Sequence, residues 1–287
     1  MLEAVTEDRL RTLGLTAFAD EVRRQQQTPD CLPLTFDERL GLCVDAQWVA
    51  RSNRQVARRI QEAHFRVAAA PEALQYATPR EWNATLIRQL NQALWVPQHQ
   101  TVLVTGPTGV GKTFLVCAWG TAACRRNARV RYTRLPRLLA AGLTAKQEGT
   151  WFAWLRHLQR FDLLILDEWA QAPLTTEESR DLLEILDDRY QTRATCIASQ
   201  VPVDRWHDWF PDPTTADAVL DRLVHQAIQV PIRGESMRKV LSTRAASGTT
   251  DPRLRGGRPP LDPWPTFISL TGQHFPEHVA NLARIRS

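Results

Sequence analysis

The stretch that decides the fold of this chain is Thr101-Val-Leu-Val-Thr-Gly106-Pro107-Thr108-Gly109-Val110-Gly111-Lys112-Thr113. An apolar strand runs directly into the pattern G-x-x-x-x-G-K-T and then into a segment typical of a helix. The glycines let the backbone turn so that successive N–H groups point at phosphate oxygens, next to the positive end of the helix dipole. The pattern predicts a P-loop for a nucleoside triphosphate. Its predicted cofactor-binding residues are Gly106, Pro107, Thr108, Gly109, Val110, Gly111, Lys112, Thr113 and Phe114.

Within this loop, two side chains have predicted chemical roles. The ammonium of Lys112 is expected to reach the β- and γ-phosphates, which makes it a catalytic as well as a binding residue. The hydroxyl of Thr113 is expected to ligate Mg²⁺. A glycine-rich turn without any ligand is the alternative interpretation.

A second motif, Phe161-Asp-Leu-Leu-Ile-Leu-Asp167-Glu168, begins 48 residues after Thr113 and has the character of a Walker B strand. A nearly continuous apolar run suits a central parallel strand that is buried on both faces, and its carboxylates emerge at the carboxyl end where such sheets bind ligands. Asp167 is expected to hold Mg²⁺ through water or Thr113, and Glu168 to orient and polarise the attacking water. An acidic pair after a buried strand is weak evidence alone, and its position after a P-loop strengthens it.

A third apolar strand, residues 194–200, ends in Ser199 and Gln200. These side chains are expected to lie beside Asp167 across the sheet. Ser199 is a predicted cofactor contact, and Gln200 is a predicted catalytic residue that senses the γ-phosphate and helps to place water. The alternative is that the two polar residues only end a strand.

Composition limits the class of protein. The chain has 287 residues, enough for one P-loop domain and a smaller module. It contains no apolar run long enough to span a membrane, and its N-terminus lacks the basic flank and apolar stretch of a secretory signal. Its five cysteines form no C-x-x-C pair, which suits a reducing compartment. We expect a soluble, cytoplasmic protein with no membrane partner.

Arginine dominates the basic residues, since only three of the 36 are lysines. The planar guanidinium of arginine binds phosphate oxygens through two hydrogen bonds, which an ammonium cannot do. A bias in genomic base composition is the alternative explanation for the excess of arginine over lysine. Residues 51–66 hold five arginines against one glutamate, with several on one helical face. Such a stripe can follow a nucleic-acid backbone, and a solvated face or a protein-docking surface is the alternative. The DNA-binding candidates in this stripe are Arg51, Arg54, Arg58, Arg59 and Arg66.

The pattern of elements predicts three regions: an all-helical N-terminal domain over residues 1–75, an α/β ATPase domain over 76–246 and a proline- and arginine-containing tail over 247–287. Helices are expected over 8–27 and 35–65, the second started by a capping box at Thr35 and Glu38. The apolar residues of the second helix are expected to pack on the first. Those apolar residues include Leu40, Val44 and Trp48. The tail is expected to be weakly ordered, and docking on the oligomer or recruitment of a partner are alternatives for it.

Beyond the P-loop and the acidic pair, further motifs resemble one family. They are Ala172-Pro-Leu-Thr, Arg180-Asp-Leu-Leu-Glu-Ile-Leu-Asp-Asp-Arg-Tyr190, Ser199-Gln-Val-Pro-Val-Asp-Arg-Trp-His207, Asp212-Pro-Thr, Leu220-Asp-Arg-Leu-Val-His225, Gly234-Glu-Ser-Met-Arg238 and the N-terminal Leu34-Thr-Phe-Asp-Glu-Arg-Leu-Gly-Leu-Cys-Val-Asp45. Over residues 8–246 the chain resembles IstB, the AAA+ ATPase helper of an insertion-sequence transposase, and more distantly the DnaC helicase loader. The expected fold is therefore an α/β P-loop AAA+ core with a parallel sheet, preceded by a small all-helical domain.

The resemblance implies residue roles and partners. It implies ATP and Mg²⁺ as cofactors, Arg222 as an arginine finger projected into a neighbouring subunit's site, and Arg238 as a second sensor next to the nucleotide. A surface ion pair with Asp221 or Asp217 is the alternative for Arg222. AAA+ proteins turn loops after the second strand toward a central pore, which adds Arg134, Arg137 and Lys146 to the DNA-binding candidates.

The implied function is that of a homo-oligomeric ring or spiral that assembles on duplex DNA with ATP, remodels it and recruits or stimulates a cognate transposase. A DnaC-like replicative helicase loader is the alternative. A small-molecule P-loop kinase is the third hypothesis, and the Asp-Arg-Leu element with the helical N-terminal module argues against it.

Overall fold

The computed structural model describes residues 4–31, 33–74, 76, 80–234 and 236–237. The described chain divides into two compact units, one that extends to Arg51 and one that begins at Ser52. The prediction for the tail, residues 247–287, lies outside the described residues. In the described part of the chain, no helix is both long and apolar enough to cross a membrane.

The first unit is all-helical, as expected. It contains α1 (Ala4–Thr12), α2 (Thr16–Gln27), the short 3₁₀ helix η1 (Pro29–Cys31) and the first part of α3 (Phe36–Glu62). The prediction of one helix over 8–27 is wrong, because the chain turns at Gly14, whose φ is +76°. A residue in this left-handed region cannot continue an α-helix, and glycine adopts it without steric cost.

The capping box at the start of α3 is confirmed. The backbone N–H of Glu38 donates to the Thr35 hydroxyl at 3.3 Å, and the Glu38 carboxylate accepts from the Thr35 N–H at 2.8 Å. Two backbone donors that the first turn leaves unpaired are thereby satisfied.

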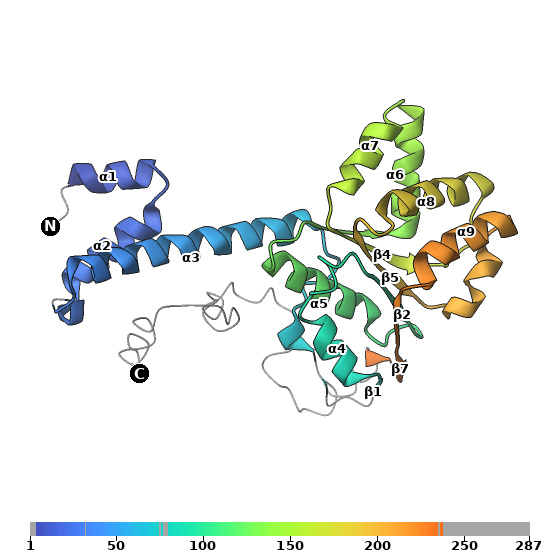
Figure 1. Cartoon of the computed structure of the whole chain (residues 1–287), viewed down its shortest axis with the longest axis horizontal. Helices are drawn as coiled ribbons and strands as arrows, with labels where there is room; N and C mark the ends of the chain where they lie inside the picture. The colour runs from blue at the N-terminus through green and yellow to red at the C-terminus, as the bar shows by residue number, and fades with distance from the viewer. Residues whose placement is uncertain (1–3, 32, 75, 77–79, 235, 238–287) are drawn as a thin grey trace, which may run out of the picture. The chain divides into compact units, whose positions relative to one another are not determined.

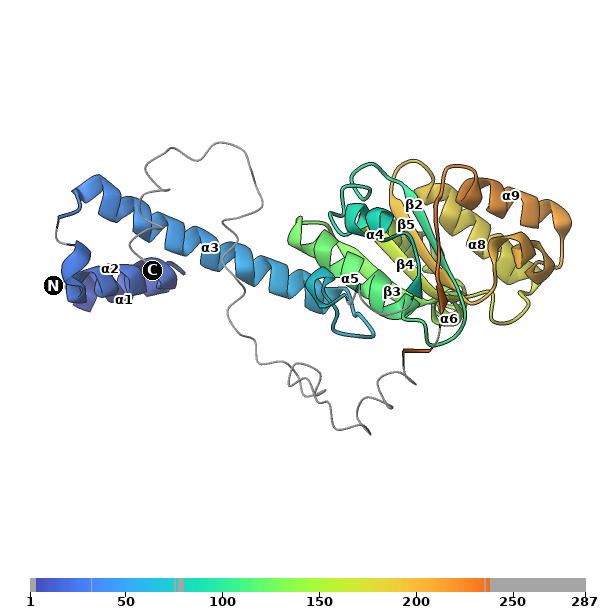
Figure 2. The ribbon, with the colours of Figure 1, turned by 90° about the horizontal axis from the view of Figure 1, so that it is seen from below.

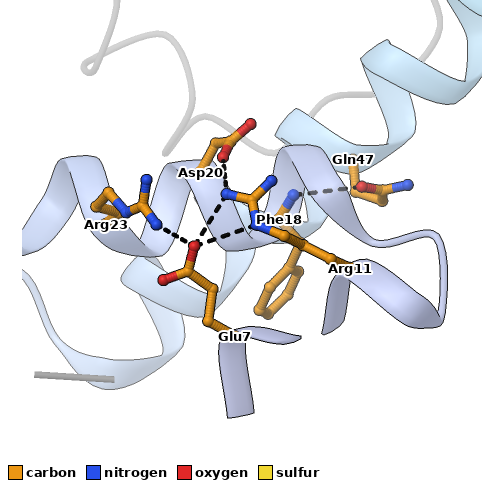
Figure 3. Close-up of polar contacts among 6 residues, drawn as sticks. All are labelled: Glu7, Arg11, Phe18, Asp20, Arg23 and Gln47. Atoms are coloured by element: carbon orange, nitrogen blue, oxygen red, sulfur yellow. Dashed lines mark hydrogen bonds and ion pairs between the residues drawn. The ribbon is translucent and has the colours of Figure 1, made fainter. Parts of the chain in front are cut away.

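Charged side chains join α1 to α2 (Figure 3). Arg11 donates to Glu7 at 3.0 Å and to Asp20 at 2.6 Å, and Arg23 of α2 also pairs with Glu7. These two arginines lower the pKa of Glu7 to about 2, Arg23 having the larger effect. Gln47 of α3 accepts a hydrogen bond from the N–H of Phe18 at 3.3 Å.

The predicted apolar contact between α3 and the preceding helices is wrong. Leu40, Val44 and Trp48 are exposed, and Trp48 keeps 74% of its surface accessible. The buried positions here are small or polar instead, for example Gln25, which donates to the Arg39 carbonyl at 3.0 Å and to Cys43 Sγ at 3.5 Å. Leu40, Val44 and Trp48 therefore form an exposed row rather than part of a core.

The second unit is built on a five-stranded sheet in the order β3-β4-β5-β2-β6, and every adjacent pair is parallel. The strands are β2 (Thr101–Thr105), β3 (Val130–Arg134), β4 (Leu163–Trp169), β5 (Ala194–Ser199) and β6 (Ile228–Pro231). The chain leaves the interior strand β2 and returns at the far edge as β3. Open α/β sheets bind ligands at the carboxyl ends of their strands, which here include β2, β5 and β4.

Helices cover both faces of this sheet (Figure 1). They are α4 (Ala84–Leu90), α5 (Lys112–Arg125), α6 (Leu135–Gln147), α7 (Trp151–Gln159), α8 (Thr176–Arg189) and α9 (Pro213–Val224), with 3₁₀ helices η2 (Pro71–Ala73) and η3 (Val203–Trp209). Figure 2 shows α4 and α5 on one side of the sheet and α8 and α9 on the other. A capping box formed by Thr175 and Glu178 begins α8.

Successive residues of the strands alternate between two apolar cores. Val102 and Val104 of β2 belong to the core on the α5 side, whereas Leu103 between them belongs to the core under α6, α8 and α9. Because side chains alternate across a strand, a strand covered on both faces must be apolar at every position. The parallel sheet and the helical N-terminal unit confirm the predicted fold class.

A small antiparallel pair completes the unit. The strand β1 (Arg80–Glu81) pairs with β7 (Arg233–Gly234) just after β6. The backbone N–H of Ile232 donates to the Thr105 carbonyl at 2.8 Å, so the segment after β6 lies against the start of the P-loop.

Candidate active site

The P-loop joins the end of β2 to the start of α5. Gly109 and Gly111 have φ values of +86° and +100°, a region where a side chain is strained. Gly111 is also the N-cap of α5, so the first N–H groups of this helix face the loop. The loop therefore has the backbone geometry that binds phosphate.

Lys112 is largely buried in this loop, with 8% of its surface exposed. Its ammonium donates to the carbonyl oxygens of Gly106 at 2.7 Å and Pro107 at 2.9 Å. Burial lowers the pKa of Lys112, and the nearby Asp167 acts in the opposite direction. Within the described residues its partners are neutral carbonyls, so its charge stays available for an anion in the loop.

Asp167 is the centre of a hydrogen-bond cluster at the carboxyl ends of β4 and β3. Its Oδ2 accepts from the hydroxyls of Thr113 and Tyr132, both at 2.7 Å, and its Oδ1 accepts from the N–H of Glu168 at 2.8 Å. The two predicted metal residues, Thr113 and Asp167, are therefore brought together. Carboxylate and hydroxyl oxygens form a donor set that Mg²⁺ prefers, so the residues fit this ion.

Tyr132 was not assigned a role from the sequence. It is buried in the middle of β3, and burial together with the charge of Asp167 raises its pKa above the usual range. Its hydroxyl therefore stays protonated and donates to the carboxylate. No local motif marked this contact, because Tyr132 lies in the middle of β3 and meets Asp167 only through the pairing of β3 with β4.

Glu168 is held by two arginines. Arg66 donates to its Oε1 at 2.7 Å, and Arg134 lies 3.4 Å from its Oε2. Glu168 itself has a φ of +59°, which is uncommon for a residue with a side chain. The hydrogen bond to Glu168 raises the pKa of Arg66. Two residues predicted as DNA contacts thus lie at the predicted catalytic carboxylate.

Ser199 and Gln200 have different surroundings. The Ser199 hydroxyl donates to the Trp169 carbonyl at 3.0 Å and accepts from the Val201 N–H at 3.1 Å, so it bridges the ends of β4 and β5. Gln200 accepts a hydrogen bond from the hydroxyl of Thr108 at 2.7 Å. Gln200 therefore contacts the P-loop, whereas the recorded bonds of Ser199 are to backbone; the nucleotide roles of both stay predictions.

The segment after β7 lies against the P-loop. The N–H of Met237 donates to the Gly109 carbonyl at 2.9 Å, and a Cβ at Gly109 would collide with the Ser236 hydroxyl. Sequence reasoning did not find this contact. Arg238, the predicted second sensor, lies outside the described residues.

Arg222 lies on α9, where it pairs with Asp187 of α8 and donates to the Ala218 carbonyl at 2.8 Å. This partner differs from Asp221 and Asp217, the acids expected from the sequence. Within the described chain, neither recorded contact joins Arg222 to the P-loop or to the acidic pair.

The other DNA-binding candidates lie in different environments. Arg51, Arg54, Arg58 and Arg137 are exposed, whereas Arg59 donates to the Asn127 carbonyl and is partly buried. Burial lowers the pKa of Arg59. The ammonium of Lys146 pairs with Glu177 at 3.2 Å and with Asp181, and it lies 5.0 Å from the Trp151 ring centroid.

Fold and site together define a class. The sheet is parallel and has this strand order, a P-loop follows its interior strand β2, and an acidic pair lies on β4, which is separated from β2 by one strand. These are the features of a P-loop ATPase of the AAA+ type. The chain belongs to the family of IstB-like ATP binding proteins, whose model matches residues 8–245. The resemblance found in the motifs is thereby confirmed.

Relatives agree with this assignment. The chain is similar to the insertion sequence ATP-binding protein y4pL of Sinorhizobium fredii, with 41% identity over 83% of this chain and 98% of that protein. It is also similar to the ATP-binding protein of insertion sequence IS1162 from Pseudomonas fluorescens, with 37% identity over 70% of this chain and 88% of that protein. Among solved structures, AMPPCP-bound DnaA from Aquifex aeolicus shares the fold, with a TM-score of 0.52, 18% identity and coverage of 67% of this chain and 58% of that one.

Proposed function

We propose that this protein is an ATP-dependent regulator of DNA transposition that assembles as a homo-oligomeric ring or spiral on duplex DNA. In this proposal it remodels the target DNA and recruits or stimulates the cognate transposase. The observation that carries it is the cluster of Thr113, Tyr132 and Asp167 beside the P-loop, in a chain 41% identical to an insertion sequence ATP-binding protein.

The chemistry follows from the placed side chains. Bound Mg²⁺ would neutralise charge on the β- and γ-phosphates, and Thr113 and Asp167 are the residues that would hold it. Lys112 and the loop N–H groups bind the triphosphate and stabilise the charge that develops on it. Glu168 orients the attacking water once its carboxylate is free of Arg66 and Arg134, and Gln200 is placed by Thr108 at the edge of the loop.

Arg222 acts on a neighbouring subunit in this proposal. Its recorded bonds to α8 and α9 leave it outside the site of its own chain. An arginine supplied in trans increases the rate of P-loop hydrolases by about 10³ to 10⁵. We therefore expect Arg222→Ala to bind ATP normally and to hydrolyse it at least about 10³-fold more slowly.

Mixing two inactive variants tests this role. Arg222→Ala keeps an intact P-loop and Glu168, and Glu168→Gln keeps an intact arginine finger and is expected to assemble with ATP. If the finger acts in trans, mixed oligomers contain sites with both parts, and turnover returns on mixing. Mixtures that stay inactive, while sizing shows that the two variants co-assemble, would contradict the role in trans.

Contact with DNA is proposed through a set of arginines that are exposed or partly exposed. They are Arg51, Arg54, Arg58, Arg59, Arg66, Arg134 and Arg137, with Lys146 as the eighth candidate. Lys146 would have to leave Glu177 and Asp181 to reach a phosphate. Backbone contacts carry little sequence information, so binding should depend steeply on salt and weakly on base sequence.

The decisive experiment uses Glu168→Gln, which should keep ATP bound without cleaving it. We expect this variant to form large assemblies on duplex DNA with ATP, measured by light scattering after size-exclusion chromatography, and Lys112→Ala to form none. Protein that stays monomeric under all these conditions would contradict the proposal. Strong preference for single-stranded DNA would favour the helicase-loader alternative instead.

A further inference from the structure

A basic pocket lies beside the acidic pair, at the edge strand β3. It has a volume of about 630 Å³ and is lined by fourteen described residues of α6, α7, β3, the segment after α3 and the segment between α7 and β4. Six of these are basic, and none is an aspartate or glutamate. The basic residues are His64, Arg66, Arg131, Arg134, Arg137 and His157.

The positive charge of this pocket is only partly neutralised. Arg66 and Arg134 share one carboxylate, that of Glu168. Among the described residues, no carboxylate lies within ion-pair distance of Arg131 or Arg137. Burial lowers the pKa of Arg131, because its charge is partly removed from water. Four guanidinium groups around one carboxylate would repel one another, so an anion in the pocket would be stabilising.

The pocket is separate from the P-loop. Tyr132 forms part of its wall, and the hydroxyl of Tyr132 binds Asp167 on the metal side. The triphosphate has its own loop, helix N-terminus and lysine. The positive charge of the pocket is therefore available to an anion other than the triphosphate.

We propose that this pocket is a phosphate-binding site that holds a backbone phosphate of the DNA, with Arg131 and Arg137 as its main contacts. This inference rests on the proposed function and adds to it a site where the protein contacts the DNA backbone. The guanidinium fork matches phosphate oxygens, and the volume is large enough for a phosphodiester with its sugar.

The same chemistry could come from free phosphate, so the test separates the two sources. Binding of a fluorescent 30-base-pair duplex to the full chain is measured by anisotropy with a non-hydrolysable ATP analogue over a range of salt concentrations. The variants are Arg131→Gln and Arg137→Gln. Arg156→Gln is the matched control, because Arg156 is an exposed arginine on α7 outside the pocket lining.

We expect each pocket variant to weaken duplex binding by about tenfold, the usual effect of losing one charge-assisted hydrogen bond, and to reduce the salt slope by about 1. The control should bind like the wild type. Inorganic phosphate at constant ionic strength should displace little duplex, because the duplex presents many phosphates at once.

Two results would overturn the inference. One is pocket variants that bind duplex like Arg156→Gln while ATP-analogue binding shows them folded. The other is inorganic phosphate that binds the wild type but not Arg131→Gln, measured by calorimetry, without displacing any duplex, which would assign the pocket to free phosphate. A wild-type protein that binds no duplex would instead contradict the proposed function itself, so the two failures are distinguishable.

Discussion

Replacing Arg66 with alanine should increase ATP hydrolysis in the absence of DNA. Arg66 holds the Glu168 carboxylate through a 2.7 Å hydrogen bond, and the side chains of the pair keep 46% and 19% of their surface exposed. An ion pair this open to solvent is screened, so breaking it costs about 1 kcal/mol of free energy. Breaking a buried pair would cost several kcal/mol. If Glu168 must leave the arginine to reach water, about 1 kcal/mol corresponds to a rate increase of about fivefold.

The assay is steady-state phosphate release at saturating ATP and Mg²⁺, with nucleotide affinity measured separately. Arg125→Ala is a matched control, because Arg125 forms an ion pair of similar length with Glu72, at 2.6 Å. We expect the control to hydrolyse ATP at the wild-type rate. A rate that falls in Arg66→Ala, with ATP binding intact, would refute the reasoning and show that Arg66 positions Glu168 for catalysis.

Three further predictions follow from the described contacts. Tyr132→Phe removes one of the two hydroxyls on Asp167 Oδ2, and should raise the Mg²⁺ concentration for half-maximal ATPase activity by about tenfold or more; an unchanged Mg²⁺ requirement would contradict this. Gly109→Ala forces a side chain into a left-handed φ and against Ser236, and should reduce ATP affinity measured by calorimetry, whereas tight binding would count against the loop geometry. The lowered pKa of Glu7 contributes stability that is present above pH 4.5 and is lost as the pH falls toward about 2. Hydrogen exchange in α1 should therefore accelerate over this pH range in the wild type more than in Glu7→Gln. Equal pH profiles of the two proteins would contradict the role of the ion pairs.

Much of the site was predictable because its parts are local patterns. The glycines and Lys112 lie within eight consecutive residues, and their spacing alone specifies a backbone that can bind phosphate. The apolar run before Asp167 predicts a doubly covered strand, and a parallel sheet presents such strand ends at one edge. The meeting of Thr113 and Asp167 therefore follows from the sequence before any coordinates.

The helical unit was less predictable. A row of apolar residues at helical spacing predicts a buried face, yet Leu40, Val44 and Trp48 are exposed. Periodicity identifies one apolar face but not the element that covers it, and in this unit small and polar residues such as Gln25 and Cys43 occupy the contact. The break at Gly14 depends on a single left-handed residue, a weak signal within a helical pattern.

The sequence by itself determined the P-loop, the acidic pair, the parallel core and the family, since each rests on residues close together in the chain or on motifs in a fixed order. Only the tertiary structure decided that Arg66 binds Glu168, that Tyr132 completes the Asp167 cluster and that Ser236 lies over Gly109. These pairs are separated by 102, 35 and 127 positions along the chain. Their contact depends on how the strands and the flanking segments pack, and no local preference of either partner encodes it.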